Sequence, residues 1–438
     1  MNVSRANLTL AEALREAEAH YLNANPKSHR QYQQACACMP GGNTRSILFY
    51  APFPLTIARG EGARLWDIDG HRYTDFLGEY SAGLYGHSHP AITGAVQRAL
   101  ADGILFGGPN AYEAKLAALV RERFPSCEQI RFCNSGTEAN VMALSATRAI
   151  TGRSHIMACK GAYHGGVFSF ASANTAMNLP VPTVLADFND LPGTLALIER
   201  HAKELAAIII EPMMGAAGCI PAKPEYLQGL RDAASAHGII LIFDEVMTSR
   251  LAPGGLQKAL GITPDMTTFG KYVGGGMSFG AFGGRAEIMA RFDPRRPDAL
   301  LHSGTYNNNV LTMTAGYVGL SEVFTPEVAL AFNRNADEFR ARLNGIARER
   351  GACAQVSGVG SLMAVHFTDR PITQPRDADA TPMELRTLFH LHMLSKGYYV
   401  ARRGYLALCL PLEQADYDGF ADAFEDFLGV YGSLLRAH

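Results

Sequence analysis

The stretch M-T-T-F-G-K-Y-V-G-G-G-M-S-F-G-A, residues 266–281, decides how this chain is interpreted. A short strand-like run ends at a turn glycine, Gly270, and Lys271 follows it directly. Upstream, L-I-F-D-E-V-M at 241–247 is a second buried strand, which ends in Asp244 and Glu245. Side chains just beyond such strands lie at the carboxyl edge of an α/β sheet, where ligands bind. A lysine and an acid so placed suit an amine that attacks carbonyls and a carboxylate that holds a ring nitrogen.

Length and composition narrow the class of protein. The chain has 438 residues, 47% hydrophobic and 18% charged, with a formal net charge of -2. This composition predicts a large buried core with extensive subunit contacts, and it gives no reason to expect a nucleic-acid partner. The eight cysteines are scattered, and the C-x-C pair at Cys36 and Cys38 is a poor zinc signal, so we expect reduced thiols and no metal. No run has the length of a signal peptide core or a membrane span, which predicts a cytoplasmic protein.

The pattern along the chain predicts three segments. Residues 1–90 form an N-terminal arm, helical over 5–38, followed by an antiparallel meander with a D-G turn at 69–70. Residues 91–325 alternate helices with short apolar strands, which indicates a mostly parallel α/β sheet. Residues 326–438 read as a smaller α+β unit.

One candidate anion site lies in R-F-C-N-S-G-T-E-A-N, residues 131–140. A strand ends near Cys133, and Ser135, Gly136 and Thr137 open a helix, whose free amides and two hydroxyls form an anion cradle. An ordinary turn with an N-cap serine is the alternative. Thr305, in H-S-G-T, is a second hydroxyl able to cap a phosphate, or else part of a turn before a helix.

Further candidates follow other strands. Tyr163 in G-A-Y-H-G-G could stack on a flat ring with His164 beside it, although packing on the core is the more common role for a loop aromatic when this motif is taken alone. Glu211 ends A-A-I-I-I-E, and Asp244 is placed to keep a ring nitrogen protonated. Val246 could pack on the ring face opposite Tyr163. Helix capping or a structural ion pair is the alternative for both acids.

Lys271 is the candidate catalytic residue. A solvated loop lysine is the usual alternative, but a strand before it and glycines after it place a ligand against bare backbone. Together these residues predict pyridoxal 5'-phosphate (PLP), bound to Lys271 as a Schiff base, with the released amine moving a proton between substrate and cofactor carbons.

With these motifs assembled, the chain resembles the class III (fold type I) aminotransferases, in the branch that includes glutamate-1-semialdehyde aminomutase. The motifs are S-G-T-E-A-N, Y-H-G, E-P-M, F-D-E-V, T-x-x-G-K and H-S-G-T, in this order. The resemblance implies a large domain with a mostly parallel seven-stranded sheet between helices, and a smaller α+β domain built from both termini. It implies a homodimer with shared active sites, in which Thr305 joins the phosphate site of the partner subunit.

The chain departs from the aminomutase pattern where the substrate is chosen. G-G-N-T-R-S moves the N-terminal arginine to Arg45, and Ser278 and Phe279 replace a Pro-Val pair. Two stretches resemble the aromatic β-amino acid aminotransferases of this branch instead. They are R-S-I-L-F-Y-A-P-F-P-L-T-I-A-R-G-E-G (residues 45–62) and G-G-G-M-S-F-G-A. That resemblance implies Arg45 for the donor carboxylate and Arg403 for the acceptor carboxylate.

Aromatic substrates need an apolar wall, for which Tyr80 and Phe53 are the candidates. The sequence therefore predicts transamination of an aromatic β-amino acid such as β-phenylalanine, with 2-oxoglutarate as acceptor. Two alternatives stay open at this point: a glutamate-1-semialdehyde aminomutase, and a non-catalytic PLP-binding protein.

Overall fold

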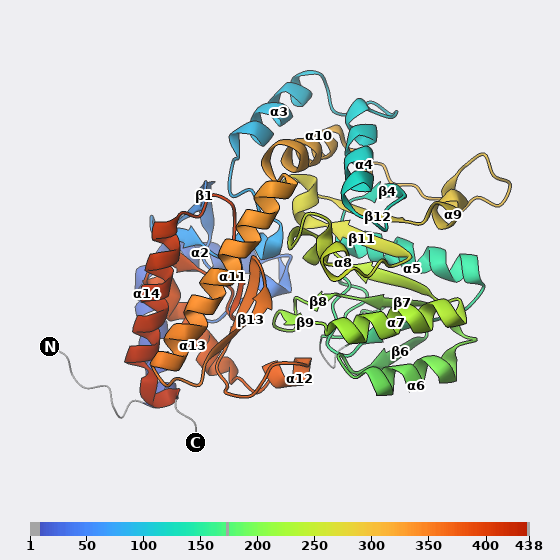
Figure 1. The fold of residues 1–438 in the computed structure, drawn as a ribbon. Coiled ribbons are helices and arrows are strands. Elements are labelled where there is room, and N and C mark those ends of the chain that lie inside the picture. Colours follow the sequence, from blue (N-terminus) through green and yellow to red (C-terminus); the bar gives the residue numbers. More distant parts are fainter. Residues whose placement is uncertain (1–8, 172–174, 436–438) are drawn as a thin grey trace.

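The centre of the molecule is a seven-stranded sheet in the order β4-β12-β11-β10-β7-β5-β6 (Figure 1). The computed structural model describes residues 9–171 and 175–435. Strand β12 runs antiparallel to both of its neighbours, and the other pairs run parallel. The prediction of a mostly parallel sheet is therefore confirmed. Its strands are β4 (Gln129–Cys133), β5 (His155–Cys159), β6 (Thr183–Ala186), β7 (Leu205–Ile210), β10 (Ile240–Asp244), β11 (Met266–Gly270) and β12 (Gly280–Gly284).

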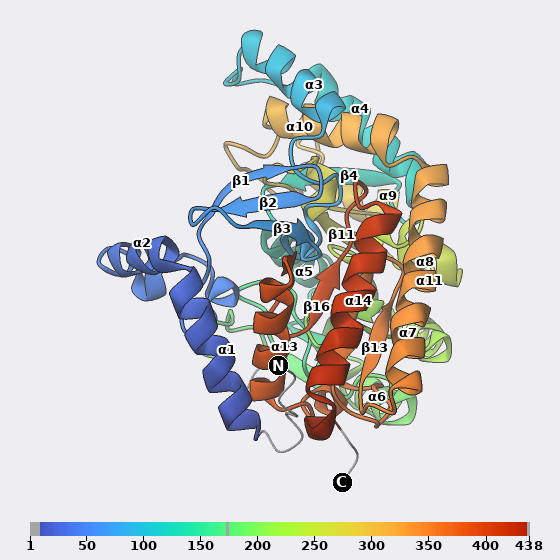
Figure 2. The ribbon, with the colours of Figure 1, turned by 90° about the vertical axis from the view of Figure 1, so that its left-hand side faces the viewer.

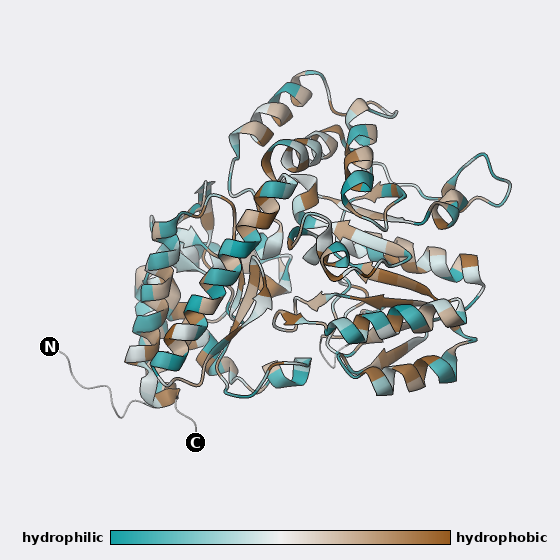
Figure 3. Ribbon diagram, viewed as in Figure 1, coloured by the Kyte–Doolittle hydropathy of each residue, from teal (hydrophilic) through white to brown (hydrophobic). Residues whose placement is uncertain are grey.

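Apolar residues on both faces explain why these strands are central. In β7, Ile208 and Ile210 pack with α6 (Leu191–His201) and α7 (Pro224–His237), whereas Ala207 and Ile209 pack with α5 (Gly136–Thr151) on the other face. Successive strand side chains point to opposite faces, so a run of apolar residues serves both. Figure 3 shows these strands in brown between helices that carry teal on their outer sides.

A second region combines the two ends of the chain. Strands β1 (Ile57–Glu61), β2 (Arg64–Asp67) and β3 (Arg72–Asp75) form the predicted antiparallel meander, and β15 (Tyr398–Tyr399) adds to β3 in parallel. The pairing of β3 with β15 confirms a smaller α+β part built from both termini. The exact division of the chain at residues 90 and 325 stays a prediction. A three-stranded sheet lies beside it, with β13 (Gln355–Val359), β14 (Leu362–His366) and β16 (Tyr405–Ala407).

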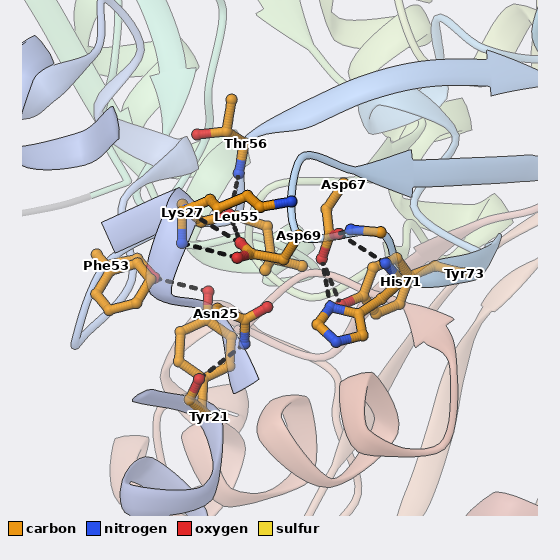
Figure 4. Close-up of polar contacts among 12 residues, drawn as sticks. Tyr21, Asn25, Lys27, Phe53, Leu55, Thr56, Asp67, Asp69, His71 and Tyr73 are labelled. Atoms are coloured by element: carbon orange, nitrogen blue, oxygen red, sulfur yellow. Dashed lines mark hydrogen bonds and ion pairs between the residues drawn. The ribbon is translucent and has the colours of Figure 1, made fainter. Parts of the chain in front are cut away.

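The N-terminal arm consists of two helices, α1 (Leu10–Ala24) and α2 (Pro26–Cys36), rather than one, because Pro26 cannot continue α1. Part of the predicted helix, residues 5–8, lies outside the described residues. Figure 2 shows both helices in blue at one side of the molecule. Asp69, in the predicted turn, accepts hydrogen bonds from the amides of Lys27 and Ser28 at 2.7 and 2.9 Å and so fixes α2 on the meander (Figure 4).

The remaining elements enclose these sheets. They are β8 (Met213–Met214), β9 (Ile220–Pro221), α3 (Pro90–Ala101), α4 (Ala111–Arg123), α8 (Gly255–Leu260), α9 (Ala286–Met289), α10 (Val310–Val318), α11 (Pro326–Glu349), α12 (Pro375–Ala378), α13 (Met383–Ser395) and α14 (Gln414–Val430). Within residues 9–171 and 175–435, no helix combines the length and the apolar character needed to cross a bilayer.

Candidate active site

Four of the predicted site segments follow strands at one edge of the seven-stranded sheet. Ser135 comes two residues after β4, Glu211 directly after β7, Asp244 ends β10 and Lys271 directly follows β11. Strands β7, β10 and β11 are parallel neighbours, so their carboxyl ends meet. The sheet topology thus brings together side chains that are up to 136 residues apart in sequence.

Asp244 is a buried carboxylate with three hydrogen-bond donors. Oδ2 accepts from Asn140 Nδ2 and from His164 Nδ1, both at 2.8 Å, and Oδ1 accepts from the Val246 amide at 3.1 Å. Thr268 Oγ1 in turn donates to Asn140 Oδ1 at 2.6 Å. These contacts fix the orientation of the carboxylate. The sequence analysis did not identify Asn140. It could have been found as a polar residue on the otherwise apolar, buried face of α5.

Tyr163 and His164 point in opposite directions. The Tyr163 ring is 45% exposed and free to stack on a ligand, whereas His164 is 1% exposed and lies behind Asp244. The expectation that His164 lies beside Tyr163 at the ligand is therefore corrected: His164 orients Asp244. Its neighbour Tyr163 is positioned by Glu211, because Glu211 Oε2 accepts the Tyr163 amide at 3.1 Å.

Glu211 braces two loops. Its second oxygen, Oε1, accepts the Gly215 amide at 3.1 Å. Burial raises the pKa of Glu211 to about 7, the charge of Asp244 adds to the rise, and His164 opposes it. Glu211 therefore holds the Tyr163 loop and the Gly215 loop together at the sheet edge.

The predicted anion cradle is present as a helix N-terminus. Ser135 caps α5 by accepting the Glu138 amide at 3.1 Å, and Thr137 Oγ1 accepts the Gly166 amide at 3.3 Å. A Cβ on Gly136 would come within 2.8 Å of Val246 Cγ1. Gly136 is thus required for close packing of Val246, a reason that the sequence did not reveal.

Lys271 is half-buried, and its Nζ donates a hydrogen bond to the Tyr80 carbonyl at 2.6 Å. Burial is the main cause that lowers the pKa of Lys271, and the nearby cations of Arg403 and Arg45 also lower it. Asp244 and Glu79 oppose them, and the resulting pKa is about 8. An amine with such a pKa is substantially neutral near pH 8 and therefore nucleophilic.

The carbonyl that receives Lys271 belongs to a left-handed turn. Gly78, Glu79, Tyr80 and Ser81 have φ values of 50°, 45°, 52° and 80°. Non-glycine residues in this region cost roughly 1–2 kcal/mol each, and such strain gathers at functional sites. Arg250, fully buried, holds the turn: its Nη1 donates to the Ser81 carbonyl at 3.1 Å.

Two guanidinium groups lie close to the Tyr80 ring. The Arg45 Cζ lies 5.6 Å and the Arg403 Cζ 5.5 Å from the ring centroid. Arg45 also forms an ion pair with Glu79. Tyr405 stacks on Tyr80 with centroids 6.0 Å apart. The predicted substrate residues Arg45, Tyr80 and Arg403 are therefore brought together next to Lys271. Glu79, the partner of Arg45, was not predicted, because nothing local in the sequence signals it.

Comparison with known proteins decides the family. The model of the family "Aminotransferase class-III" matches residues 49–428. This chain belongs to the class III aminotransferases. It is 52% identical to a β-phenylalanine transaminase of Variovorax paradoxus over 97% of this chain and 98% of the relative.

Two solved structures are similar. A β-phenylalanine aminotransferase from Variovorax paradoxus superposes with a TM-score of 0.96 at 51% identity, covering 98% of this chain and 99% of its own. A transaminase with PLP bound superposes with a TM-score of 0.86 at 32% identity, covering 94% and 99% of the two chains. The fold of this class III aminotransferase is fold type I, as predicted, and its cofactor is PLP.

The residues of this class III aminotransferase fit PLP. The helix N-terminus at Gly136 offers free amides to a phosphate, the buried Asp244 carboxylate suits a protonated ring nitrogen, and Lys271 offers a neutral amine. No group of three or more His, Cys, Asp or Glu suited to a metal ion occurs in the described parts of the chain.

Two other predicted residues lie elsewhere. Phe53 is 1% exposed and stacks on His29 with centroids 4.6 Å apart, in the core beneath α1 and α2. The Phe53 ring has no exposed surface for a substrate, so that prediction is wrong. The alternation of apolar and polar residues over 52–76 predicts strands, but it does not show that helices of the N-terminal arm cover Phe53. Thr305 is exposed in the loop before α10, apart from the residues that gather at the sheet edge around Lys271.

The lowered pKa of Lys271 predicts a pH dependence for cofactor capture. The rate at which the cofactor-free protein binds PLP covalently should rise about tenfold between pH 6 and 7 and no more than about twofold above pH 8, because about half of Lys271 is already deprotonated at pH 8. Stopped-flow absorbance measures this rate. A small lysine derivative with an ordinary pKa serves as control and should continue to accelerate above pH 9. A protein rate that followed the control would contradict the assignment.

Proposed function

We propose that this aminotransferase moves the amino group of an aromatic β-amino acid, such as β-phenylalanine, to 2-oxoglutarate, giving a β-keto acid and glutamate. The observation that carries the proposal is the pair of guanidinium groups, Arg45 and Arg403, that lie within 5.6 Å of the Tyr80 ring centroid beside Lys271. Two carboxylate sites beside one amine suit a donor and an acceptor that use the same centre in turn. The Variovorax relative, named for β-phenylalanine, supports the donor.

The cofactor, when bound, supplies the carbonyl that takes the substrate amine and an electron-withdrawing ring. The residues of the chain supply positioning and proton transfer. Asp244, ionised and held by Asn140 and His164, keeps a proton at the ring nitrogen. With PLP bound, Lys271 Nζ would be the base that takes the proton from the substrate carbon and returns it to the cofactor carbon that supplied the carbonyl.

The remaining contacts hold the reactants in place. Ser135, Gly136 and Thr137 would present the first-turn amides and hydroxyls of α5 to the phosphate, and the exposed Tyr163 ring, together with Val246, would pack against the cofactor ring. Glu211 keeps the Tyr163 loop in position through the Tyr163 amide.

Donor recognition requires Arg45 to exchange its partner. In the structure Arg45 pairs with Glu79, and both side chains are half-exposed, at 43% and 53%. A donor carboxylate that replaces Glu79 gains a charge-assisted hydrogen bond from Arg45. A β-amino acid carries its carboxylate one carbon further from the amine, which suits an arginine on the N-terminal segment.

Assembly as a homodimer is part of the proposal. Leu105 is 74% exposed and Phe106 is 53% exposed, and Leu301 and Tyr306 are exposed in the loop that carries Thr305. A hydrogen bond from Asn110 Nδ2 to the Asn308 carbonyl at 2.8 Å joins the two segments. Such an apolar surface is typical of a subunit interface, and it would bring Thr305 to the phosphate site of the other subunit. All eight cysteines are free thiols, which supports a cytoplasmic location.

Replacing Arg45 by alanine tests the donor site. We expect kcat/KM for β-phenylalanine to fall about 100-fold, because the carboxylate loses a bidentate partner, while the fold is retained. Arg59→Ala is a matched control: Arg59 also pairs with a glutamate, Glu61, and lies over an aromatic ring, Trp66, but on strand β1. Unchanged donor kinetics in Arg45→Ala would contradict the assignment of the donor carboxylate to Arg45.

The two alternative functions give different results in the same assay. An aminomutase needs no external acceptor, and an inert binding protein forms no product. Glutamate released from β-phenylalanine and 2-oxoglutarate by the wild type supports transamination, and the absence of glutamate would reject it.

A further inference from the structure

A cavity of about 660 Å³ opens beside the active site. Its lining includes the small-residue segment Gly215–Gly218, His366 at the end of β14, Arg386 on α13 and Arg403. Arg403 is shared between this cavity and the cluster around Tyr80. The cavity therefore continues outward from the point where the acceptor carboxylate is proposed to bind.

Of the three arginines that line this cavity, Arg376 is exposed, whereas Arg386 and Arg403 are half-buried. Within the described residues, neither Arg386 nor Arg403 has a carboxylate at ion-pair distance, and the hydrogen bond of Arg386 goes to the Ala378 carbonyl. By contrast, Lys160 at the rim of the cavity is paired with Asp187 at 3.0 Å. Arg386 and Arg403 are both half-buried, and the Nε atom of each is buried without a hydrogen-bond partner.

Such an arrangement favours an anion. Half-buried cations without counter-ions are costly, and a bound carboxylate offsets that cost. Burial lowers the pKa of Arg386, the charge of Arg403 lowers it as well, and the exposed Asp379 opposes them. Two planar guanidinium groups on one cavity match two carboxylates on one small molecule.

We propose that Arg386 binds the distal carboxylate of a dicarboxylic 2-oxo acid, while Arg403 holds the carboxylate next to the oxo group. Arg386 is then the residue that makes the enzyme prefer a dicarboxylic acceptor over a monocarboxylic one. This inference rests on the proposed function, because it takes the acceptor to react at Lys271.

Arg386→Gln is the test variant, because glutamine keeps a donor for the Ala378 carbonyl and removes the charge. We expect kcat/KM for 2-oxoglutarate to fall about 30-fold or more and kcat/KM for pyruvate to change less than about twofold. Arg386→Lys, which keeps the charge without the planar fork, should lie between the two. Equal losses for both acceptors, no loss for either, or a wild type that prefers pyruvate would each overturn the inference.

A binding measurement supports the same distinction without turnover. By calorimetry, the wild type should bind glutarate about tenfold or more tightly than butanoate, and Arg386→Gln should bind both alike. Equal affinities in the wild type would overturn the inference. The donor half of the reaction, measured with β-phenylalanine and no acceptor, should be unchanged in Arg386→Gln. If the wild type did not react with β-phenylalanine in this donor half-reaction, the proposed function would be rejected. That result differs from equal binding of glutarate and butanoate, which rejects only the role of Arg386.

Discussion

Lys271→Ala is expected to lower kcat by about 10⁴-fold or more, because the variant loses both the covalent link to the cofactor and the amine that moves the proton. Lys271 is suited to these roles by its place at the end of β11, its hydrogen bond to the Tyr80 carbonyl at 2.6 Å and its pKa of about 8. Borohydride reduction followed by peptide mass spectrometry should find the cofactor on the peptide containing Lys271 in the wild type, and on no peptide in the variant.

Two controls separate chemistry from misfolding. Lys258→Ala, an exposed lysine on α8, should leave kcat unchanged. Adding a small primary amine to Lys271→Ala should restore part of the rate, because the amine can enter and carry the proton. A Lys271→Ala protein that still formed a reducible covalent link would refute the assignment.

Asp244→Asn changes the size of the side chain little but is expected to lower kcat by about 10²–10⁴-fold. The reason is that a neutral amide cannot hold a proton on the ring nitrogen. The amide also disrupts the network. Asn140 and His164 both donate to Oδ2, and the Val246 amide donates to Oδ1, so no orientation of an amide accepts all three hydrogen bonds. Steady-state rates at saturating donor and acceptor measure the loss.

Asp265→Asn is the matched control for a buried aspartate. Asp265 pairs with Arg231 at 3.0 Å and with Arg285 at 3.2 Å, near the start of β11 and at the opposite end of that strand from Lys271. Its loss should lower the thermal stability and leave kcat within about twofold. If both variants lost stability and activity in the same proportion, a catalytic role for Asp244 would be contradicted.

The fold and the cofactor residues were predictable because both depend on local patterns. Apolar runs such as Leu205–Ile210 must be strands buried on both faces, and buried parallel strands place Glu211, Asp244 and Lys271 at one sheet edge. A helix that begins at Gly136 after a strand likewise implies free amides.

The contacts that act through distant segments were not predictable. The Tyr80 carbonyl accepts a hydrogen bond from Lys271 Nζ. It lies in a left-handed turn in which only Gly78 is a glycine, so the sequence does not indicate the turn. Arg250 holds this turn from a segment 169 residues away. Phe53 was misplaced for a similar reason, because its ring is covered by helices α1 and α2, whose docking depends on contacts such as that of Asp69.

The central claim is that this aminotransferase takes the amino group of a β-amino acid onto its cofactor beside Lys271. The most direct measurement mixes the cofactor-loaded enzyme with β-phenylalanine and no acceptor, and follows the absorbance of the bound cofactor together with the keto product. The account predicts complete conversion of the cofactor band with one equivalent of keto product per site, and reversal on adding 2-oxoglutarate. A cofactor band that stayed unchanged with β-phenylalanine would contradict it.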